Sequence, residues 1–342
     1  TPTIFRATEQ WFVAVDRPLS GQDQTLRELA MACCSQDLDA GGVNFVPGWG
    51  RNRILGMLES RPDWCLSRQR SWGVPLTVLT CTDCGEILKE TAVCERIEAM
   101  FEKEGADAWF QHDAEAFVPD GVQCSCGSTN FEKENDILDV WFDSGVSHAA
   151  VLEPREELQA PADLYLEGSD QHRGWFQSSL LTSMGTREQA PFKGVLTHGY
   201  VVDGKGKKMS KSIGNVILPQ EMIDKFGAEI LRLWVSSEDY RDDVKVSEEI
   251  LRRVSDAYRK IRNTLRFLLS NLNDFDPAQD AVGPESFSEM DRWALARFAD
   301  LVRRVEQAYD RYEFHAIYHG LLNFCGTVIS SLYMDVLKDR LY

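Results

Sequence analysis

The sequence lacks several features that mark common classes of protein. It has no run of about eighteen apolar residues, so it predicts no membrane span. It also lacks an excess of positive charge. The formal net charge is −17, which argues against a protein that coats nucleic acid non-specifically. The N-terminal segment has neither an initiator Met nor a signal-peptide pattern, and we therefore expect a piece of a longer protein.

Cysteine is present without being dense. Nine cysteines in 342 residues, with one adjacent pair and one Cys-x-x-Cys, do not resemble the framework of a small secreted domain. We therefore expect a reducing compartment, the cytoplasm. A chain of this length can bury a large core and should hold two or three domains.

The most unusual segment is the lysine-rich stretch at residues 199–212. Four lysines lie within seven residues beside Gly204 and Gly206, namely Lys205, Lys207, Lys208 and Lys211. Glycine disfavours a fixed helix or strand, so the stretch predicts a mobile, positively charged loop. Such a loop can close over a polyphosphate, whereas a solvated run of charge is the alternative. A Walker P-loop is excluded because Gly206, not Ser or Thr, follows the lysine.

Residues 208–212 read Lys-Met-Ser-Lys-Ser, which is similar to the KMSKS signature of class I aminoacyl-tRNA synthetases. The resemblance implies a loop that binds the ATP phosphates during amino-acid activation, assisted by Mg²⁺. It assigns charge stabilisation of the phosphates to Lys208 and Lys211, and further ATP contacts to Met209 and Ser210.

Three other blocks resemble the synthetases for branched aliphatic amino acids. They read Asp-Trp-Cys-Leu-Ser-Arg-Gln-Arg from residue 63, Asp-Val-Trp-Phe-Asp-Ser-Gly from residue 139 and Glu-Gly-Ser-Asp-Gln-His-Arg-Gly-Trp-Phe from residue 167. A packed corner with exposed arginines is the alternative for the first block. The wording of the first two favours the isoleucyl family, and a valyl or leucyl relative is the alternative.

The third block follows a predicted buried strand at residues 164–166 and precedes a helix expected to run to Met184. Ligands of open α/β sheets bind beyond the carboxyl ends of the strands, against helix N-termini. A helix cap would explain Ser169 or Asp170 alone, but not the whole polar cluster. The resemblance implies that the aminoacyl-adenylate is held by Glu167, Gly168, Asp170 and Gln171, with Trp175 lining the side-chain pocket.

A further strand, predicted at residues 192–198, brings His198 and Gly199 to the same sheet edge. A lone histidine is more often a satisfied core residue. The position of His198 at a strand end beside the lysine-rich stretch instead favours contact with adenosine.

Residues 77–135 have a different character from their surroundings. They contain Cys81-x-x-Cys84 and Cys124-x-Cys126, each pair followed by Gly, and a helix predicted at residues 92–104. Two such knuckles can wrap one tetrahedral Zn²⁺, because the glycine lets backbone amides turn toward the thiolates. We expect a structural zinc, since four thiolates leave no open position. Four reduced, partly buried cysteines are the alternative, and Cys94 could replace one ligand.

The remaining pattern predicts short elements and then a helical region. Strands are expected within residues 3–15, 43–49 and 137–142, the last ending in a turn at 143–145. Helices are expected at 20–34, 51–59, 219–226 and 227–236. From residue 249 an apolar seam of period three to four predicts the first of three bundle helices, and it consists of Leu251, Val254, Tyr258, Ile261, Leu265, Leu268 and Leu272.

The first of these helices also carries a basic face that includes Arg252, Arg259 and Arg266. Snorkelling arginines on an ordinary bundle helix are the alternative. The family resemblance implies the start of an anticodon-stem-binding domain, in which these arginines contact tRNA.

Together these features predict an α/β fold, the second half of a Rossmann-type class I catalytic domain with a zinc-ribbon-like insertion, followed by an α-helical bundle. The expected boundaries are 1–76, 77–135, 136–248 and 249–342. The expected reaction is the activation of L-isoleucine with ATP and its transfer to tRNA(Ile) by a monomeric ligase. No His-x-Gly-His occurs in the sequence, so we expect this chain to lack the first catalytic half and the editing region, and to be inactive alone. A non-catalytic, zinc-stabilised tRNA-binding module is the alternative from another class.

Overall fold

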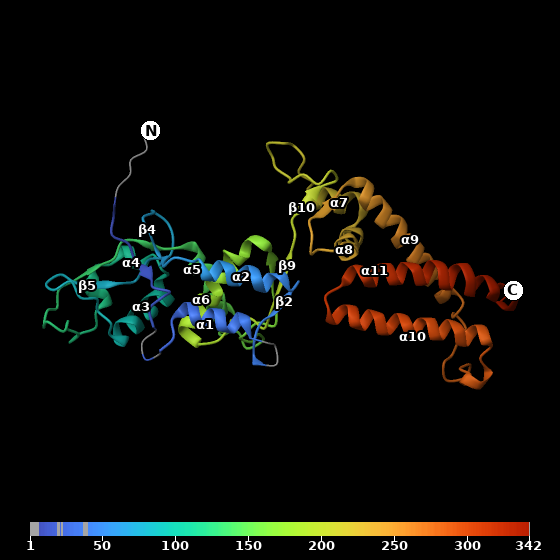
Figure 1. Ribbon diagram of the computed structural model, residues 1–342, viewed down its shortest axis with the longest axis horizontal. Coiled ribbons are helices and arrows are strands. Elements are labelled where there is room, and N and C mark those ends of the chain that lie inside the picture. Colours follow the sequence, from blue (N-terminus) through green and yellow to red (C-terminus); the bar gives the residue numbers. More distant parts are fainter. Residues whose placement is uncertain (1–6, 19–20, 22, 37–39, 342) are drawn as a thin grey trace. The chain divides into compact units, whose positions relative to one another are not determined.

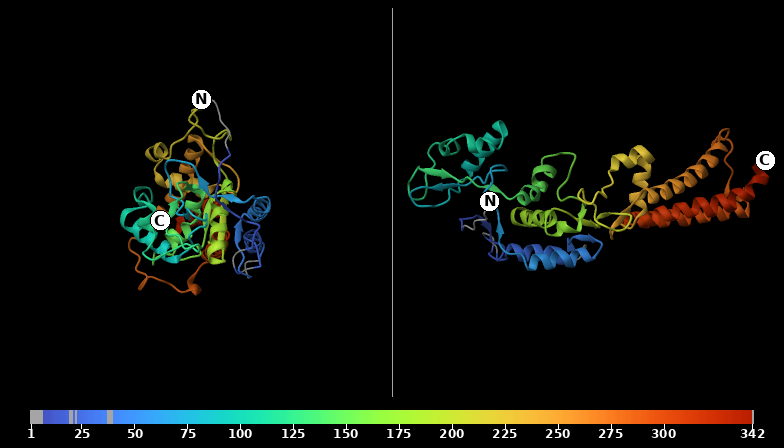
Figure 2. Two further views of the ribbon diagram at one scale, coloured as in Figure 1. Left: turned by 90° about the vertical axis from the view of Figure 1, so that its left-hand side faces the viewer. Right: turned by 90° about the horizontal axis from the view of Figure 1, so that it is seen from above.

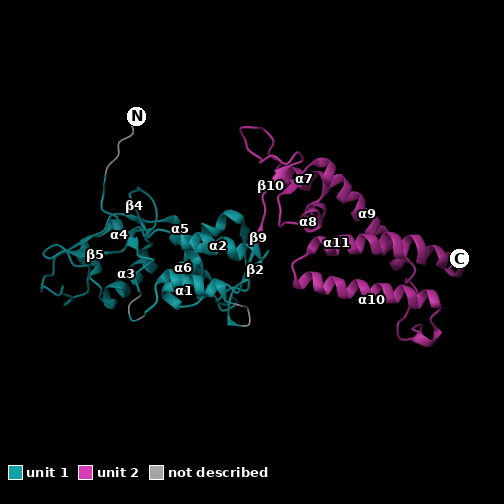
Figure 3. Ribbon diagram, in the orientation of Figure 1, with its two compact units in different colours: residues 1–196 teal, residues 197–342 magenta. Residues whose placement is uncertain are grey.

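The computed structural model describes residues 7–18, 21, 23–36 and 40–341. The chain divides into two compact units, residues 1–196 and residues 197–342 (Figure 3). The predicted strand within 3–15 and the predicted helix from residue 20 begin outside the described residues. Their described parts are the strand β1 (Phe12–Val13) and the helix α1 (Leu26–Ser35).

The core of unit 1 is an α/β arrangement. A three-stranded sheet has the order β2 (Asn44–Val46), β9 (Gly194–His198) and β8 (Tyr165–Gly168). β2 and β9 are parallel, with Asn44 opposite Gly194. The predicted strands at 43–49 and 192–198 are confirmed in shortened form. The one at 164–166 is confirmed as β8, which runs two residues further, to Gly168.

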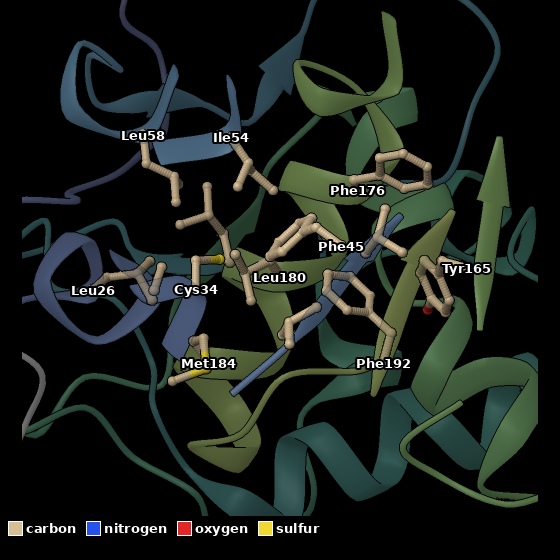
Figure 4. Close-up of a cluster of buried hydrophobic side chains, with 14 of the residues drawn as sticks. Leu26, Cys34, Phe45, Ile54, Leu58, Tyr165, Phe176, Leu180, Met184 and Phe192 are labelled. Carbon is tan, nitrogen blue, oxygen red and sulfur yellow. The ribbon is translucent and has the colours of Figure 1, made fainter. Parts of the chain in front are cut away.

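Helices pack beside this sheet. They are α1, α2 (Trp49–Glu59), α5 (Val140–Gly145) and α6 (Trp175–Arg187). α6 contacts both α1 and α5. The start of α1 is fixed by a capping box between Thr25 and Glu28. Figure 4 shows side chains from α1, α2, α6 and the sheet meeting in one cluster, where Ile54, Phe176 and Leu180 are fully buried.

The prediction of a strand over residues 137–142 is wrong beyond its first two residues. Only β7 (Ile137–Leu138) is extended, and α5 begins immediately afterwards. The reason is Asp139, whose carboxylate caps α5 by accepting a hydrogen bond from the Trp141 amide at 3.4 Å. The expected turn at 143–145 is the last part of this helix.

Two small antiparallel pairs and two short helices complete the main body of unit 1. β1 pairs with β3 (Trp64–Cys65), and β4 (Ser67–Arg68) pairs with β7. The short helices are η3 (His148–Leu152), of the wide π type, and η4 (Ser169–His172), of the 3₁₀ type. The helix expected from the third motif block is thus divided, with η4 preceding α6.

The cysteine-bearing segment has its own elements and its own core. β5 (Leu79–Cys81) and β6 (Phe131–Lys133) form an antiparallel pair, accompanied by α3 (Thr91–Glu104), α4 (Ala108–Gln111) and η2 (Ala114–Phe117). Its helix prediction is confirmed by α3. Trp109 and Phe117 are fully buried in a cluster separate from that of the main body. Figures 1 and 2 show this segment gathered at one end of unit 1.

Unit 2 begins with a parallel strand pair, β10 (Val201–Asp203) and β11 (Val244–Val246), with Val202 opposite Lys245. The prediction of an irregular loop from residue 199 is therefore wrong for β10. The helices α7 (Pro219–Phe226) and α8 (Ala228–Ser237) confirm the two predicted near residue 227. They pack on each other and on α9 (Glu248–Ser270), around the buried residues Ile230, Trp234 and Leu251.

The rest of unit 2 is helical, as predicted. After η5 (Pro284–Ser286), α10 (Glu289–Asp310) packs against α11 (Phe314–Asn323), which continues into the wide helix η6 (Phe324–Tyr333) and α12 (Met334–Leu341) (Figure 1). The apolar seam of α9 is buried only at its start. Leu251 is 0% exposed, whereas Leu265 and Leu272 are about half exposed.

One helical segment meets the size and composition of a membrane span, which the sequence did not predict. Phe314–Leu341 forms 28 helical residues with a hydropathy of 1.3 in its most apolar window, of which 17% is buried. A single helix of this kind is weak evidence for a membrane protein. This one packs along α9 and α10 within unit 2.

Candidate functional site

In unit 1, the predicted substrate-binding residues lie where β8 leads into α6. Glu167 is exposed near the end of β8, and Gly168 is buried beside it. The Gln171 side chain links two other residues of this segment through hydrogen bonds. Its Oε1 accepts a hydrogen bond from the Trp175 amide at 3.0 Å, and its Nε2 donates to Asp170 Oδ2 at 3.2 Å. The structure therefore brings these five residues together at the N-terminus of a helix, as predicted.

Trp175 is held in a fixed orientation by its neighbours. Its ring stacks on Tyr165 with 4.1 Å between centroids and 10° between planes. Its Nε1 donates to Ser147 Oγ at 3.1 Å. Tyr165 is itself buried and forms a hydrogen bond with Ser179 Oγ at 3.0 Å. A side chain fixed on both its ring face and its polar edge is suited to line a pocket of defined shape.

The sequence reasoning missed Trp141, which lies at the same place. A Cβ added to Gly174 would lie 2.6 Å from Gln171 Oε1 and 2.7 Å from the Trp141 ring, so these two side chains pack closely over Gly174. Trp141 is nevertheless 42% exposed. The available signal in the sequence was a tryptophan among several acids in one short block. The strand prediction for residues 137–142 gave this tryptophan no role in the site.

Two buried polar groups fix the surrounding framework. His172 is fully buried and donates from Nδ1 to the Ser169 carbonyl at 3.0 Å, and burial lowers its pKa. It is therefore a neutral structural histidine at pH 7. Asp139 is also buried, where it accepts from Trp64 Nε1 at 2.9 Å and pairs with Arg68 at 3.0 Å.

In unit 2, the lysine-rich stretch after β10 is organised by two polar side chains that the sequence reasoning missed. Asp203 Oδ1 accepts from the Lys205 and Lys207 amides, both at 2.9 Å. Asn215 bridges the two ends of the stretch, because its Nδ2 donates to Asp203 Oδ2 at 2.9 Å and its Oδ1 accepts from the Ser210 amide at 2.9 Å. The Asp-Gly and Gly-Asn pairs at these positions were the available turn signals.

The two halves of the KMSKS string differ in their packing. Met209 packs against the apolar cluster of α8 and α9, which anchors the base of the stretch. Lys208 and Lys211 are exposed, and Lys208 Nζ lies 5.9 Å from the Tyr200 ring centroid. Ser210 Oγ forms a hydrogen bond with Ser212 Oγ at 3.1 Å. The arrangement presents lysines to solvent on a fixed base, which suits capture of a polyphosphate.

His198 and Gly199 stand at the end of β9, as predicted. The Nδ1 of His198 is 2.7 Å from the Gly199 carbonyl, to which it donates. Gly199 has a structural reason to be glycine, because an added Cβ would collide with the backbone at Asp242 and Asp243. Its amide donates to the Tyr240 carbonyl at 2.8 Å.

The four cysteines of the insertion converge. The Sγ atoms of Cys81, Cys84, Cys124 and Cys126 all lie within 4.8 Å of one another. Cys81 and Cys126 are 3.7 Å apart, and Cys84 and Cys124 are 3.4 Å apart. Gly85 and Gly127 both have positive φ, 77° and 87°, as the knuckle interpretation requires. Burial raises the pKa of the Cys81 thiol, but hydrogen bonds from the Cys84 and Asp83 amides outweigh it and bring that pKa to about 6. Cys94 is exposed and is not a member of this cluster.

The predicted basic face of α9 is exposed but partly neutralised. Arg252, Arg259 and Arg266 lie seven residues apart and so share one side of the helix. Arg252 pairs with Glu248 at 3.0 Å, and Arg259 pairs with Asp256 at 3.1 Å. Exposed pairs of this kind are weak and exchange readily for another anion.

Comparison with known families accounts for the occurrence of these features in one chain. Residues 2–247 match the profile of the tRNA synthetases class I (I, L, M and V). The chain belongs to this family. Residues 291–342 match the anticodon-binding domain of tRNA ligases. This second match includes the apolar helical segment Phe314–Leu341, which is thereby accounted for as a helix of that domain.

Curated relatives are similar along the whole chain. It is 62% identical over 341 residues to an isoleucine–tRNA ligase of Desulfotalea psychrophila, covering 100% of this chain and 35% of the relative. It is 59% identical over 342 residues to an isoleucine–tRNA ligase of Syntrophotalea carbinolica, covering 100% of this chain and 36% of the relative. The chain thus spans about a third of the length of the curated relatives it matches.

Solved structures support the fold alone, because their sequence identity is low. The LeuRS of a ternary LeuRS-tRNA-LeuAMS complex from Agrobacterium radiobacter has a TM-score of 0.60 at 18% identity, covering 82% of this chain and 37% of that one. A Mycobacterium tuberculosis methionyl-tRNA synthetase bound by methionyl-adenylate has a TM-score of 0.60 at 18% identity, covering 92% of this chain and 52% of that one. Both support a class I catalytic fold with a helical C-terminal part.

Proposed function

We propose that this chain is the part of an isoleucine–tRNA ligase that binds the aminoacyl-adenylate and the ATP phosphates. The observation that carries the proposal is the lysine stretch, fixed at its base by Asp203 and Asn215, in a chain of the class I family. The amino acid is inferred from the curated relatives, which are named for isoleucine and match the chain from end to end.

The proposed reaction has two steps. An oxygen of the isoleucine carboxylate attacks the α-phosphorus of ATP, a new oxygen–phosphorus bond forms, and the bond to the bridging oxygen breaks to release pyrophosphate. A ribose hydroxyl of the terminal tRNA nucleotide then attacks the acyl carbon, and AMP leaves. No side chain acts as a nucleophile, so positioning and charge stabilisation provide the rate enhancement.

We assign individual roles to two groups of residues, those of the lysine-rich stretch and those at the ends of β8 and β9. Lys208 and Lys211 stabilise the negative charge that grows on the departing pyrophosphate, with Met209 and Ser210 at their base. Asp170, Gln171, Glu167 and Gly168 hold the adenylate, while His198 and Gly199 contact its adenosine. We add Trp141 to this assignment, so that Trp141 and Trp175 both border the aliphatic side chain. Mg²⁺ would neutralise part of the phosphate charge, and Lys208 and Lys211 would act together with it.

We propose a structural Zn²⁺ at Cys81, Cys84, Cys124 and Cys126. Tetrahedral Zn–S bonds of about 2.3 Å place sulfur atoms roughly 3.8 Å apart, close to the separations of the two measured pairs. The ion would cross-link β5 to the second knuckle and so stabilise a segment with a small core. Dialysis against a strong chelator should release about one zinc per chain and unfold this segment, as followed by the Trp109 environment. A metal-free chain with unchanged folding would refute the site.

The remaining proposals concern the tRNA contacts, the domain boundaries, the oligomeric state and the cellular compartment. We propose that Arg252, Arg259 and Arg266 exchange their exposed carboxylate partners for tRNA phosphates. We keep the boundaries 1–76, 77–135, 136–248 and 249–342 for the parts of the chain, and we expect a monomeric enzyme acting in the cytoplasm.

The test is isoleucine-dependent ATP–pyrophosphate exchange. The assay uses the 342-residue chain and a chimera in which it replaces the matching third of the Desulfotalea psychrophila relative. We expect exchange by the chimera with isoleucine well above valine or leucine, and little exchange by the chain alone. A chimera that folds and binds tRNA but never activates isoleucine would contradict the proposal and favour a tRNA-binding module. A preference for valine or leucine would instead identify the chain as part of a valyl- or leucyl-type synthetase of the same class.

A further inference from the structure

One tyrosine in unit 2 joins the two parts of the chain that match different family profiles. Tyr240 lies in the turn between α8 and β11, within the region that matches the class I synthetases. Its hydroxyl donates a hydrogen bond of 2.8 Å to the Tyr312 carbonyl, 72 positions further along the chain. Tyr312 lies at the corner between α10 and α11 (Figure 1), which consists of residues 311–313 and belongs to the region that matches the anticodon-binding domain. The hydrogen bond therefore ties this corner to the α8–β11 turn.

The acceptor of this hydrogen bond is held in place by the way in which α10 ends. The Tyr312 amide donates to the Tyr309 carbonyl at 3.0 Å. The next amide, that of Glu313, donates to the Ala308 carbonyl at 2.8 Å. These two bonds form a Schellman motif, in which the residue after the helix takes a left-handed conformation. Tyr312 has that conformation, with a φ of 57°, so the corner presents its carbonyl in a defined direction.

The donor is suited to this contact because it is partly buried and keeps its proton. Burial raises the pKa of the Tyr240 phenol to about 12, the charge of Arg241 opposes this shift, and that of Asp239 adds to it. The hydroxyl can therefore donate at pH 7. Arg241 adds a second link to the same corner, since it pairs with Asp239 at 2.5 Å and lies 3.8 Å from Glu313. That link is exposed and hence weak.

The backbone of the same turn holds the two residues assigned to adenosine. The Tyr240 carbonyl accepts a hydrogen bond from the Gly199 amide at 2.8 Å. The Gly199 carbonyl in turn accepts from His198 Nδ1 at 2.7 Å. Asp242 packs closely on the same glycine, because a Cβ added to Gly199 would lie 2.3 Å from the Asp242 carbonyl oxygen. A displacement of the turn is therefore passed directly to Gly199 and His198.

We propose that Tyr240 is a positioning residue for ATP. Its carbonyl holds the Gly199 amide, and its hydroxyl fixes that carbonyl relative to the α10–α11 corner. The inference rests on the proposed contact of His198 and Gly199 with adenosine, and it gives Tyr240 no contact with the substrate itself. Because the isoleucine side chain is assigned to Trp141 and Trp175 in unit 1, loss of the Tyr240 hydroxyl should weaken the use of ATP and spare that of isoleucine.

The experiment removes only the hydroxyl, by Tyr240→Phe, and uses two readouts. Hydrogen exchange of the Gly199 amide is followed in the 342-residue chain. The KM values for ATP and for isoleucine are measured by pyrophosphate exchange in the chimera described above. Tyr309→Phe is the matched control, because Tyr309 is 58% exposed and loses the same atom from the same unit. Arg241→Gln removes the exposed ion pair of the turn and leaves the Tyr240 hydroxyl in place.

We expect Tyr240→Phe to speed exchange of the Gly199 amide and to raise the KM for ATP, each by about three- to tenfold, the contribution of one hydrogen bond. The KM for isoleucine should stay unchanged, and the two other variants should alter neither readout. The inference is overturned if Gly199 exchange is unchanged in Tyr240→Phe, or if both KM values rise together. An unmodified chimera that never activates isoleucine would contradict the proposed function. An active chimera whose KM for ATP is unmoved by Tyr240→Phe overturns this inference alone.

Discussion

The two regions that carry the predicted site residues are built differently. The Glu167–Trp175 segment of unit 1 is framed by buried groups, with Trp175 stacked on Tyr165 and His172 fully enclosed. The Lys208–Lys211 segment of unit 2 presents exposed lysines, and its geometry depends on Asp203, Asn215 and the anchoring of Met209.

The difference matches the two chemical tasks proposed above. Selection of an amino acid requires a pocket whose shape does not relax, which aromatic packing over a hydrophobic core provides. Stabilisation of a departing pyrophosphate requires charges that meet the phosphates when they arrive, which long exposed lysines on a fixed base provide. The contrast therefore predicts that changes in the first region alter stability, whereas changes in the second alter rate.

The largest effect is expected for Lys211→Ala in the chimera. Loss of one charge that acts on the transition state should lower the rate of pyrophosphate exchange by about 100- to 1,000-fold. The dissociation constant for isoleucine and the melting temperature should stay nearly unchanged. Lys205→Ala, which removes the same charge from the same stretch, is the control. Equal loss of rate and of isoleucine affinity would refute the separation of roles.

Gly174→Ala should act through packing. The added methyl group meets Trp141 and Gln171, so we expect a loss of about 1–3 kcal/mol in the free energy of unfolding. Isoleucine binding should weaken in parallel. Gly56→Ala is the matched control, because Gly56 is exposed within α2 with nothing near its Cβ position, and this change should stabilise by about 0.5–1 kcal/mol. Denaturant unfolding measures both, and a neutral Gly174→Ala would contradict the packing described.

Asn215→Ala should act through geometry. It removes the bridge from Asp203 to the Ser210 amide, and we expect exchange to slow by about tenfold as the lysines lose their fixed base. The melting temperature should move little because Asn215 is only partly buried and is not a member of the apolar core of unit 2. Asn52→Ala on the exposed side of α2 is the control. A rate equal to that of the unmodified chimera would show that the bridge does not position the lysines.

The smallest effect concerns pH. Hydrogen bonds from Asn215 and from the Lys207 and Lys205 amides hold the pKa of Asp203 below its ordinary value of 3.8. A lowered folded pKa means that the contribution is present above the ordinary pKa and is lost as the pH falls through the folded value. The Lys205 and Lys207 amides should thus stay protected in hydrogen exchange from neutral pH to about pH 4 and lose protection below it. Asp203→Asn should remove this pH dependence, and an unchanged profile would exclude Asp203 as its source.

Local patterns predicted much of the fold. Helix α2, helix α3 and the three long helices of unit 2 follow from apolar periodicity, and the parallel strands β2 and β9 follow from short β-rich runs bounded by turns. The convergence of the four cysteine side chains follows from knuckle spacing and two glycines. The error at residues 137–142 arose because apolar alternation was given more weight than Asp139, whose carboxylate caps a helix.

The sequence by itself determined the family, and it located the lysine stretch and the four cysteines that converge, because short motifs fix residue types at fixed spacing. Only the tertiary structure decided that Trp141 packs over Gly174, the residue before Trp175, and that Asp203 and Asn215 order the lysine stretch. It also brought Arg61 and Gln177 into contact. Trp141 and Gly174, like Arg61 and Gln177, are far apart in the chain and meet through packing, whereas Asp203 and Asn215 are joined across the lysine stretch by a side-chain hydrogen bond.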